Sequence, residues 1–390
     1  MPVASPAPPR PRSRRRSALL LVASYAGAVT CAAFLFLAWR LHVHHATFAS
    51  RGFFWLGDLH VEDDEIGFRM RPRRQGMAVL NHGVEAPWRR IPVRTDQFGF
   101  RVPLALDSTV VQPGGIAAVG CSCTFGHGVA AESSYVQLAG ELLGLPAYNL
   151  GVCSYSSVTS LLLLRRNIAR LRPGIVVYGY GNFHVERSLA PRNDSVLFQA
   201  HAVADGDSCR IAPPRFSNRV SFASAPRIET LYYRERLAGR PTPFDLARLR
   251  ALLPLALEDL RRAPQPAFLG LRFAAPAVPE TTLCRAVLGD MQALCHEHGA
   301  RFVLLFFPAF FGETPGPGLR SALRELQGRA DFTFVDCSVR LCAGVRDQEE
   351  YSGRYQVPRD GHPNRAMHLE MARALAAALG GTPPEPRRAP

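Results

Sequence analysis

Short apolar runs that alternate with helical patterns constrain this chain more than any other feature of its 390 residues. The alternation occupies residues 116–180 and resumes over residues 281–379. Strands that alternate with helices across short loops predict a parallel sheet with helices on both faces, because a parallel strand is reached only through a crossover connection.

Five strands and five helices are expected in these two blocks. The strands are Ile116–Val119, Ala147–Asn149, Ile175–Tyr180, Arg301–Phe307 and Phe332–Val335, and the helices are Ser133–Leu143, Ser157–Leu171, Thr281–His298, Gly318–Gln327 and Asn364–Leu379. This layout predicts an α/β fold, a flavodoxin-like three-layer α/β/α sandwich with a parallel five-stranded sheet.

A serine follows the first of these strands almost at once. Gly120 ends the apolar run, Ser122 comes next but one, and Gly126 and Gly128 follow. Such a serine lies at the carboxyl edge of the sheet, where open α/β folds bind ligands. Small neighbours expose the hydroxyl, and the serine N–H can face a developing oxyanion. The alternative is an ordinary strand–helix turn with a serine cap.

Three later segments add chemistry to this serine: residues 149–157, 178–183 and 360–364. In this order and spacing, the four segments resemble the blocks of the SGNH (GDSL-type) hydrolases over roughly residues 90–380. The likeness is greatest to membrane-anchored bacterial members that carry a Gly-Phe-Arg box ahead of the serine, which stands here at residues 99–101.

The resemblance assigns a role to each block. It implies that Ser122 is the nucleophile, that His362 is its general base, and that Asp360 orients the imidazole, so that an ester is cleaved through an acyl-enzyme. The implied oxyanion donors are the backbone N–H groups of Ser122 and Ser154 and the side-chain amide of Asn182.

Four block positions depart from the family pattern. Cys121 and Phe183 replace aspartates, Ser154 replaces a glycine, and Arg359 stands where the family often has its acid, three residues before the histidine. Asp360 is assigned from the Asp-x-His pairs of related membrane-associated acetyltransferases and acetylesterases. Two other acids, Asp336 and Glu350, could take its place.

Three further residues near the blocks are candidates for lesser roles. His127 and His184 could touch substrate, although both rank below His362. Arg101 could bind an anion, but a structural ion pair is the favoured interpretation.

The amino-terminal region predicts a membrane anchor. Residues 1–16 are rich in proline and arginine and are expected to be a disordered tail, and residues 17–39 carry no charge over about the length of a membrane-spanning helix. The preceding arginines favour a cytoplasmic amino terminus. We therefore expect a single-pass protein of the bacterial inner membrane with its catalytic domain outside the cytoplasm. A cleaved signal peptide is the alternative.

The remaining boundaries follow from composition. Residues 40–105 are expected to form a linker and a small β-rich lead-in, and residues 106–380 the hydrolase-type domain. Residues 184–279 interrupt the alternation and predict an insertion or cap, with helices near Ile228–Leu237 and Phe244–Arg262. Residues 381–390 are expected to be a disordered tail.

Charge and cysteine content exclude several partners. The formal charge is +14, but the chain has no lysine and its arginines are scattered, so nucleic-acid binding is not expected. The nine cysteines show no zinc-site spacing, and neither a metal nor an organic cofactor is expected. Cys337 and Cys342 could pair in an oxidising compartment.

These observations favour a membrane-anchored serine esterase or O-acyltransferase that acts on acyl esters of envelope glycans or on small esters. The first alternative is a non-catalytic carbohydrate-binding or scaffold protein on a degenerate SGNH fold. The second is a thiol redox protein that uses Cys121 and Cys123. The sequence does not identify any protein partner.

Overall fold

The computed structural model of the protein describes residues 12–50, 52–80, 89–106, 108–193, 197–238, 243–262 and 278–380. By its internal contacts the chain divides into two units: residues 1–50 with 243–272, and residues 51–242 with 273–390. Residues 1–11 of the expected basic tail and the expected tail 381–390 lie outside the described residues.

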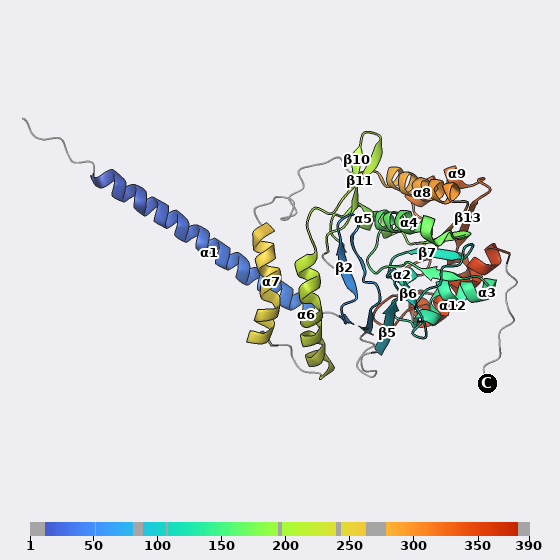
Figure 1. The fold of residues 1–390 in the computed structure, drawn as a ribbon, viewed down its shortest axis with the longest axis horizontal. Helices are drawn as coiled ribbons and strands as arrows, with labels where there is room; N and C mark the ends of the chain where they lie inside the picture. Colours follow the sequence, from blue (N-terminus) through green and yellow to red (C-terminus); the bar gives the residue numbers. More distant parts are fainter. Residues whose placement is uncertain are drawn as a thin grey trace, which may run out of the picture. The chain divides into compact units, whose positions relative to one another are not determined.

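The larger unit is built on a nine-stranded sheet within the described part of the chain (Figure 1). Its parallel strands are β7 (Ile116–Gly120), β8 (Ala147–Asn149), β9 (Ile175–Tyr180), β12 (Arg301–Phe306) and β13 (Phe332–Asp336). They lie in the order β8-β7-β9-β12-β13, which is the 2-1-3-4-5 order of flavodoxin-like folds. The predicted fold class is thus confirmed, and the topological switch point lies between β7 and β9.

Helices cover both faces of this sheet, as Figure 1 shows. One face carries α4 (Ser157–Leu171), α8 (Glu280–Glu297) and α9 (Pro317–Leu326), and the other carries α3 (Tyr135–Leu143), α10 (Ser338–Cys342), α11 (Gln348–Tyr355) and α12 (Arg365–Ala378). Successive strand residues enter opposite cores: Phe302 and Leu304 pack beneath α8, whereas Val303 and Leu305 pack beneath α12. Both faces of the parallel strands are therefore apolar, as expected for a sheet buried between helices.

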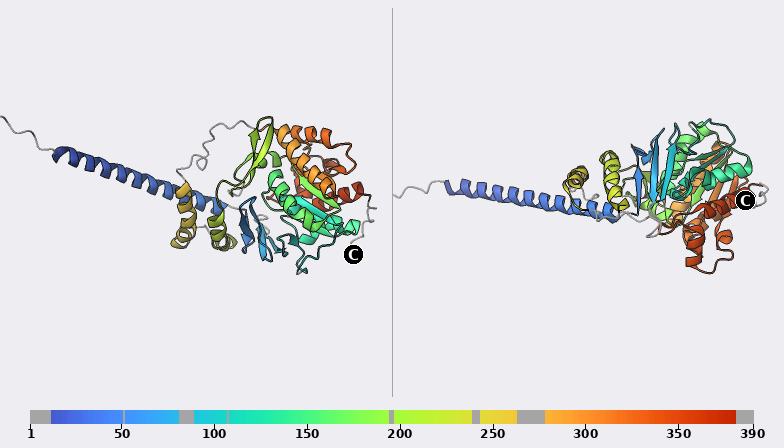
Figure 2. Two further views of the ribbon diagram at one scale, coloured as in Figure 1. Left: turned by 45° about the horizontal axis from the view of Figure 1, so that its top comes forward. Right: turned by 90° about the horizontal axis from the view of Figure 1, so that it is seen from below.

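The lead-in region joins this sheet instead of forming a separate element. Four strands extend it from the β8 edge in the order β1-β4-β5-β6: β1 (Phe53–Leu56), β4 (Gln75–Leu80), β5 (Arg89–Thr95) and β6 (Arg101–Val102). They are antiparallel, and Figure 2 shows the blue strands beside the green ones. β6 pairs with β8 at Arg101 and Asn149, so the Gly-Phe-Arg box becomes part of the sheet.

The expected insertion divides between the two units. Its first part adds α5 (His184–Leu189), the hairpin of β10 (His201–Asp205) and β11 (Ser208–Ala212), and α6 (Arg219–Leu237) to the larger unit. Its later helix, α7 (Leu246–Arg262), belongs to the unit of α1 (Arg12–Ser50). The two short elements before α3 are α2 (Ser122–Phe125) and a 3-10 turn, η1 (Ala131–Ser133).

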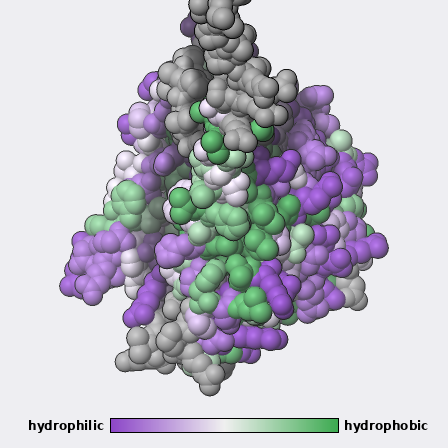
Figure 3. Space-filling view, turned by 90° about the vertical axis from the view of Figure 1, so that its left-hand side faces the viewer, coloured by the Kyte–Doolittle hydropathy of each residue, from purple (hydrophilic) through white to green (hydrophobic). Residues whose placement is uncertain are grey.

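In the smaller unit, α7 packs against α1. The Asp259 carboxylate accepts hydrogen bonds from Arg40 and His44, at 2.7 Å to each of the Arg40 Nε and His44 Nε2 atoms. Residues Leu19–Ser50 of α1 are long and apolar enough to cross a membrane, which is compatible with an anchor or a signal sequence. In Figure 3, which faces the left-hand side of Figure 1, hydrophobic residues gather in a band flanked by hydrophilic ones.

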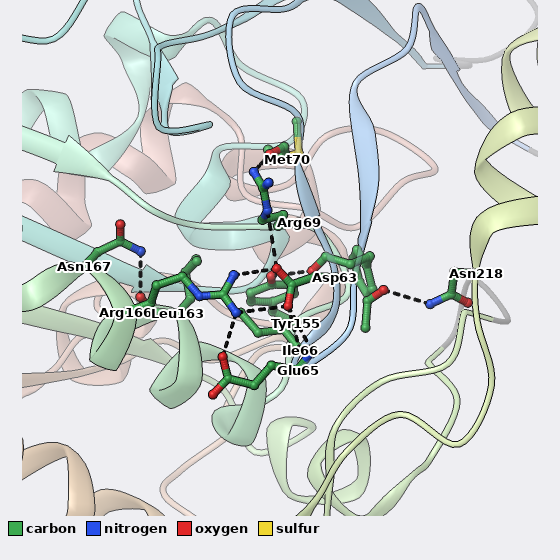
Figure 4. A network of polar contacts seen from close by, with 12 residues as sticks. Asp63, Glu65, Ile66, Arg69, Met70, Tyr155, Leu163, Arg166, Asn167 and Asn218 are labelled. Atoms are coloured by element: carbon green, nitrogen blue, oxygen red, sulfur yellow. Dashed lines mark hydrogen bonds and ion pairs between the residues drawn. The ribbon is translucent and has the colours of Figure 1, made fainter.

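A charged network in the larger unit ties the hairpin of β2 (His60–Asp63) and β3 (Gly67–Met70) to α4 (Figure 4). Arg166 of α4 donates to both oxygens of Asp63 and, at 2.6 Å, to Glu65. Burial works to raise the pKa of Asp63, but the contacts with Arg166 outweigh it and lower that pKa. The carboxylate therefore stays ionised and holds the hairpin against the helix.

Candidate active site

Ser122 lies directly beyond β7, at the carboxyl edge of the sheet beside the switch point. It is the first residue of the four-residue helix α2 and is 6% exposed. A first-turn residue has no acceptor for its N–H within the helix, so this N–H is directed outward beyond the helix end. Gly126 ends α2 in the left-handed region, at φ 81°.

Arg101 holds the turn that carries the serine. Its guanidinium donates to the carbonyl oxygens of Phe125 and Gly126, both at 2.6 Å, and of Val129 at 2.5 Å. It also lies 4.5 Å over the Phe125 ring. Burial lowers the pKa of Arg101 to about 10, so it keeps its charge at neutral pH.

The structure corrects the expected role of Arg101. No described carboxylate lies within ion-pair distance of its guanidinium, and no anion site is required to explain its burial. Backbone carbonyls at and just beyond the end of the short helix α2, those of Phe125, Gly126 and Val129, take the place of the expected acid. Sequence spacing carries no signal for this arrangement.

The segment that follows β8 fits closely against α2. A Cβ on Gly151 would lie 2.3 Å from the Phe125 nitrogen, so only glycine fits there. Val152 N–H donates to the Gly120 carbonyl at 3.1 Å. Two backbone segments that are distant in the sequence therefore meet at the serine.

His362 approaches the serine from the loop between α11 and α12. Its Nε2 lies 2.8 Å from Ser122 Oγ, and its Nδ1 lies 2.5 Å from Asp360 Oδ1. The loop is closed by the Val357 N–H, which donates to the His362 carbonyl at 2.7 Å. Asn364 then caps α12 by accepting from the N–H groups of Ala366 and Met367, which leaves His362 free of a capping role.

The Asp360 carboxylate faces two histidines. Oδ1 contacts His362, and Oδ2 lies 3.8 Å from Nε2 of His127. Burial works to raise the pKa of Asp360, but the contacts with His127 and His362 outweigh it and hold that pKa below its usual range. Ionised Asp360 favours the His362 tautomer that carries its proton on Nδ1 and presents the Nε2 lone pair to Ser122.

The alternative acids are engaged elsewhere. Asp336 Oδ1 accepts from the N–H and the hydroxyl of Ser338 at 2.8 and 2.6 Å, and Glu350 accepts from Arg346 Nε at 2.9 Å. Asp360, rather than Asp336 or Glu350, therefore contacts His362.

Ser154 adopts the left-handed backbone region at φ 65°. Glycine reaches this region without strain, which explains in physical terms why the family pattern has glycine at this position. Its neighbour Cys153 lies beside His127, with 4.0 Å between Cys153 Sγ and His127 Nδ1. The second block is thus brought to the edge at which Ser122 and His362 meet.

Asn182 departs from the expected role. Its side-chain nitrogen donates to Glu313 Oε1 and to the Thr314 carbonyl, both at 2.9 Å, and its oxygen accepts from Gly316 N–H at 2.9 Å. An amide nitrogen has two protons to donate, and both are used. The side chain therefore fixes the loop after β12 in this structure and has no donor left for an oxyanion.

The other candidate residues are buried. His184 is fully buried and its Nδ1 lies 2.9 Å from Tyr178 Oη, so it does not face a substrate. His127 is 3% exposed, and its ring lies 4.5 Å from that of His362. All nine cysteines are free, including Cys337 and Cys342, which were candidates for a disulfide.

No protein-family model matches the chain, and no curated protein matches it significantly. Solved structures are similar to it at low identity. A lipolytic protein of the G-D-S-L family from Desulfitobacterium hafniense has 12% identity and a TM-score of 0.34, over 68% of this chain and 98% of its own. An acetylxylan esterase from Geobacillus stearothermophilus has 14% identity and a TM-score of 0.33, over 70% and 97%.

A third similar structure is a salicylyl-acyltransferase from a tetracycline biosynthetic pathway. It has 14% identity and a TM-score of 0.31, and the match covers 75% of this chain and 60% of that one. The solved structures named here are thus described as a lipolytic protein, an esterase and an acyltransferase.

Proposed function

We propose that this protein is a serine esterase or O-acyltransferase that works through Ser122, His362 and Asp360. The observation that carries the proposal is the continuous chain of contacts from Ser122 Oγ to His362 Nε2, 2.8 Å, and from His362 Nδ1 to Asp360, 2.5 Å. A nucleophile, a base within hydrogen-bond reach and a third group that orients the base form the arrangement required for acyl transfer.

In the proposed reaction, Ser122 Oγ attacks the ester carbonyl while its proton passes to His362 Nε2. The C–O bond to the leaving alcohol then breaks, and His362 returns the proton to that alcohol. The backbone N–H groups of Ser122 and Ser154 would stabilise the oxyanion of the tetrahedral intermediate. Water or an acceptor hydroxyl then attacks the acyl-serine, so hydrolysis and transfer differ only in this second nucleophile.

The proposed setting is the outer face of a bacterial inner membrane, with α1 as the anchor. The uncharged run of α1 and the arginines that precede it support this orientation. Acyl esters of envelope glycans, or small esters, are the proposed substrates. Protease added to spheroplasts should degrade residues beyond α1, whereas protection from protease would place them in the cytoplasm instead.

A fluorophosphonate probe tests the proposed nucleophile. The full-length protein in detergent should be labelled at Ser122, and Ser122→Ala should lose the label. Hydrolysis of p-nitrophenyl acetate should fall by about 1,000-fold or more in Ser122→Ala and in His362→Ala. Ser217→Ala removes an exposed serine just before α6, whose hydroxyl accepts from the Arg219 N–H at 3.1 Å, and serves as the control.

The same experiment separates the alternatives. No labelling of a folded protein would favour a non-catalytic carbohydrate-binding or scaffold role. Activity that survives Ser122→Ala but is lost in Cys121→Ala or Cys123→Ala would favour a thiol redox protein.

A further inference from the structure

His127 is a buried histidine that the proposed reaction does not use. It is 3% exposed, and its Nε2 has no hydrogen-bond partner among the described residues. The Phe53 and Trp55 rings pack against its ring in T-shaped arrangements, with centroid distances of 5.6 and 5.5 Å. A buried imidazole that is fixed in place with one nitrogen unsatisfied calls for a physical explanation.

The unsatisfied nitrogen faces a carboxylate at a distance too long for a hydrogen bond. Asp360 Oδ2 lies 3.8 Å from His127 Nε2. The other His127 nitrogen, Nδ1, lies 4.0 Å from Cys153 Sγ. When Nδ1–H donates to this sulfur, the Nε2 lone pair faces the carboxylate, and two acceptors then oppose each other across a gap that a cation would fill.

A third donor completes the cluster. One ligand atom from each of His127, Asp360 and His362 can be chosen so that all three lie within 4.8 Å of one another. Two imidazole nitrogens and one carboxylate form a common zinc ligand set, which leaves the fourth position open. Zinc bonds of about 2.0–2.1 Å would span the 3.8 Å gap between Nε2 and Oδ2.

We propose that His127, Asp360 and His362 form a site for a divalent transition-metal ion such as Zn²⁺, and that binding there inhibits the enzyme. The inhibitory consequence rests on the proposed function. A metal on His362 Nδ1 replaces the contact with Asp360, and a metal on Nε2 replaces the contact with Ser122. Either bond removes His362 from proton transfer.

The ligand types set the selectivity of this site. Imidazole nitrogens favour Zn²⁺, Co²⁺, Ni²⁺ and Cu²⁺, whereas Mg²⁺ and Ca²⁺ favour oxygen donors. The donor Nδ1–H of His127 toward Cys153 would orient the imidazole in the way that outer-sphere partners orient zinc-bound histidines. Millimolar Mg²⁺ should therefore leave the site without a metal.

Metal binding is tested first without catalysis. Full-length Ser122→Ala in detergent should bind one Zn²⁺ per chain by titration calorimetry, and Co²⁺ should give the visible absorption of a four-coordinate complex. Adding His127→Asn or His127→Gln should weaken the affinity at least 10-fold, and adding His296→Asn should not. His296 is the matched control because it is exposed and its Nδ1 contacts Asp331 at 2.9 Å.

Inhibition is tested on the protein with Ser122 intact. Zn²⁺ should reduce ester hydrolysis, EDTA should restore it, and the ratio of rates with and without Zn²⁺ should move toward one in His127→Asn. A protein that binds no Zn²⁺, or that binds it equally well without His127, overturns the metal site. If the protein binds Zn²⁺ but has no esterase activity, the metal site stands and only the proposed function is refuted.

Discussion

The two sides of the candidate site are held in place by different means. On the nucleophile side, Ser122 sits in a buried turn that Arg101 fixes through three carbonyls and that Gly151 contacts closely. On the base side, the loop that carries Asp360 and His362 contains two left-handed residues, Arg359 at φ 60° and Gly361 at φ 79°.

This difference shows how one site can hold its nucleophile in a fixed position while its base remains accessible. The Ser122 turn depends on tertiary contacts from strands far away in the sequence, so damage to its supports should unfold the domain. The His362 loop depends on its own backbone conformation and is more open, with the His362 side chain 28% exposed. Damage to this loop should lower the rate more than the stability.

The largest expected effect is that of Arg101→Met. It removes the three charged hydrogen bonds that Arg101 donates to buried carbonyls, at about 1.5–3 kcal/mol each, so the free energy of unfolding should fall by several kcal/mol. Gly126 keeps the Val129 N–H at 3.2 Å and Phe125 keeps Asn149 Nδ2 at 3.4 Å, so the loss should fall most heavily on the Val129 carbonyl.

Arg170→Met is the matched control, because Arg170 lies 4.8 Å over the Phe98 ring but is exposed. Chemical denaturation measures both, and equal losses would refute the special role of Arg101.

Gly151→Ala should have the next largest effect. Its Cβ would meet the backbone of Phe125 and Thr124 at 2.3–2.8 Å, and relieving this overlap should cost about 2–3 kcal/mol. The same change at Gly289 of α8 meets nothing within 4 Å and should stabilise the protein by about 0.5–1 kcal/mol. The two variants should therefore shift the unfolding midpoint in opposite directions, and a harmless Gly151→Ala would mean that the two segments are not in contact.

Gly361→Ala should separate rate from stability on the base side. Its Cβ would meet nothing within 4 Å, so the left-handed backbone alone should cost about 1–2 kcal/mol. Because the Asp360–His362 geometry depends on this residue, ester hydrolysis should fall at least 10-fold. Gly361→Asn should recover part of the rate, since asparagine tolerates this region.

Gly344 provides the control for this prediction. It has φ 70° and its Cβ would also meet nothing within 4 Å, but it follows α10 rather than joining Asp360 to His362. Gly344→Ala should cost the same stability and leave the rate unchanged. A similar loss of rate in both variants would show that strain alone, and not the site geometry, controls the rate.

Ser154→Gly should have the smallest effect. Removing a side chain from a residue at φ 65° relieves strain, so the free energy of unfolding should rise, by less than about 1 kcal/mol. Thermal unfolding measures the shift, with Arg359→Gly, at φ 60°, as the equivalent change on the base side. A loss of stability in Ser154→Gly would show that the serine side chain contributes more than its backbone strain removes.

Local sequence patterns were sufficient to predict the layered α/β architecture of this fold. The apolar runs of the five parallel strands and the helices between them predicted a flavodoxin-like sandwich, and the observed strand order is that of this fold. The four short elements α2, α5, α10 and α11 were not predicted, because four to eight residues carry too little periodicity. The lead-in was predicted to be β-rich, but its pairing with the parallel sheet was not predicted, because its strands pair mostly with one another.

Some contacts of the candidate site were predicted from the sequence, and others were not. The order of the four sequence blocks identified Ser122, Asp360 and His362 as candidate residues, and the structure places them in contact. The use of the Asn182 amide by Glu313 and Thr314 was beyond the sequence, because those partners come from a loop that is 131 and 132 residues away.

The layers of the fold and the residue types at the sheet edge follow from the sequence, because the periodicity of apolar residues and the position of small residues after strands are local properties. Which groups meet at that edge depends on how the whole chain packs. The contacts of Arg101 with the carbonyls at the end of α2, and of His127 with Asp360, depend on how strands and loops from separate parts of the chain pack together. Burial then sets the charge and the hydrogen bonds of each group, and burial is known only once the chain has folded.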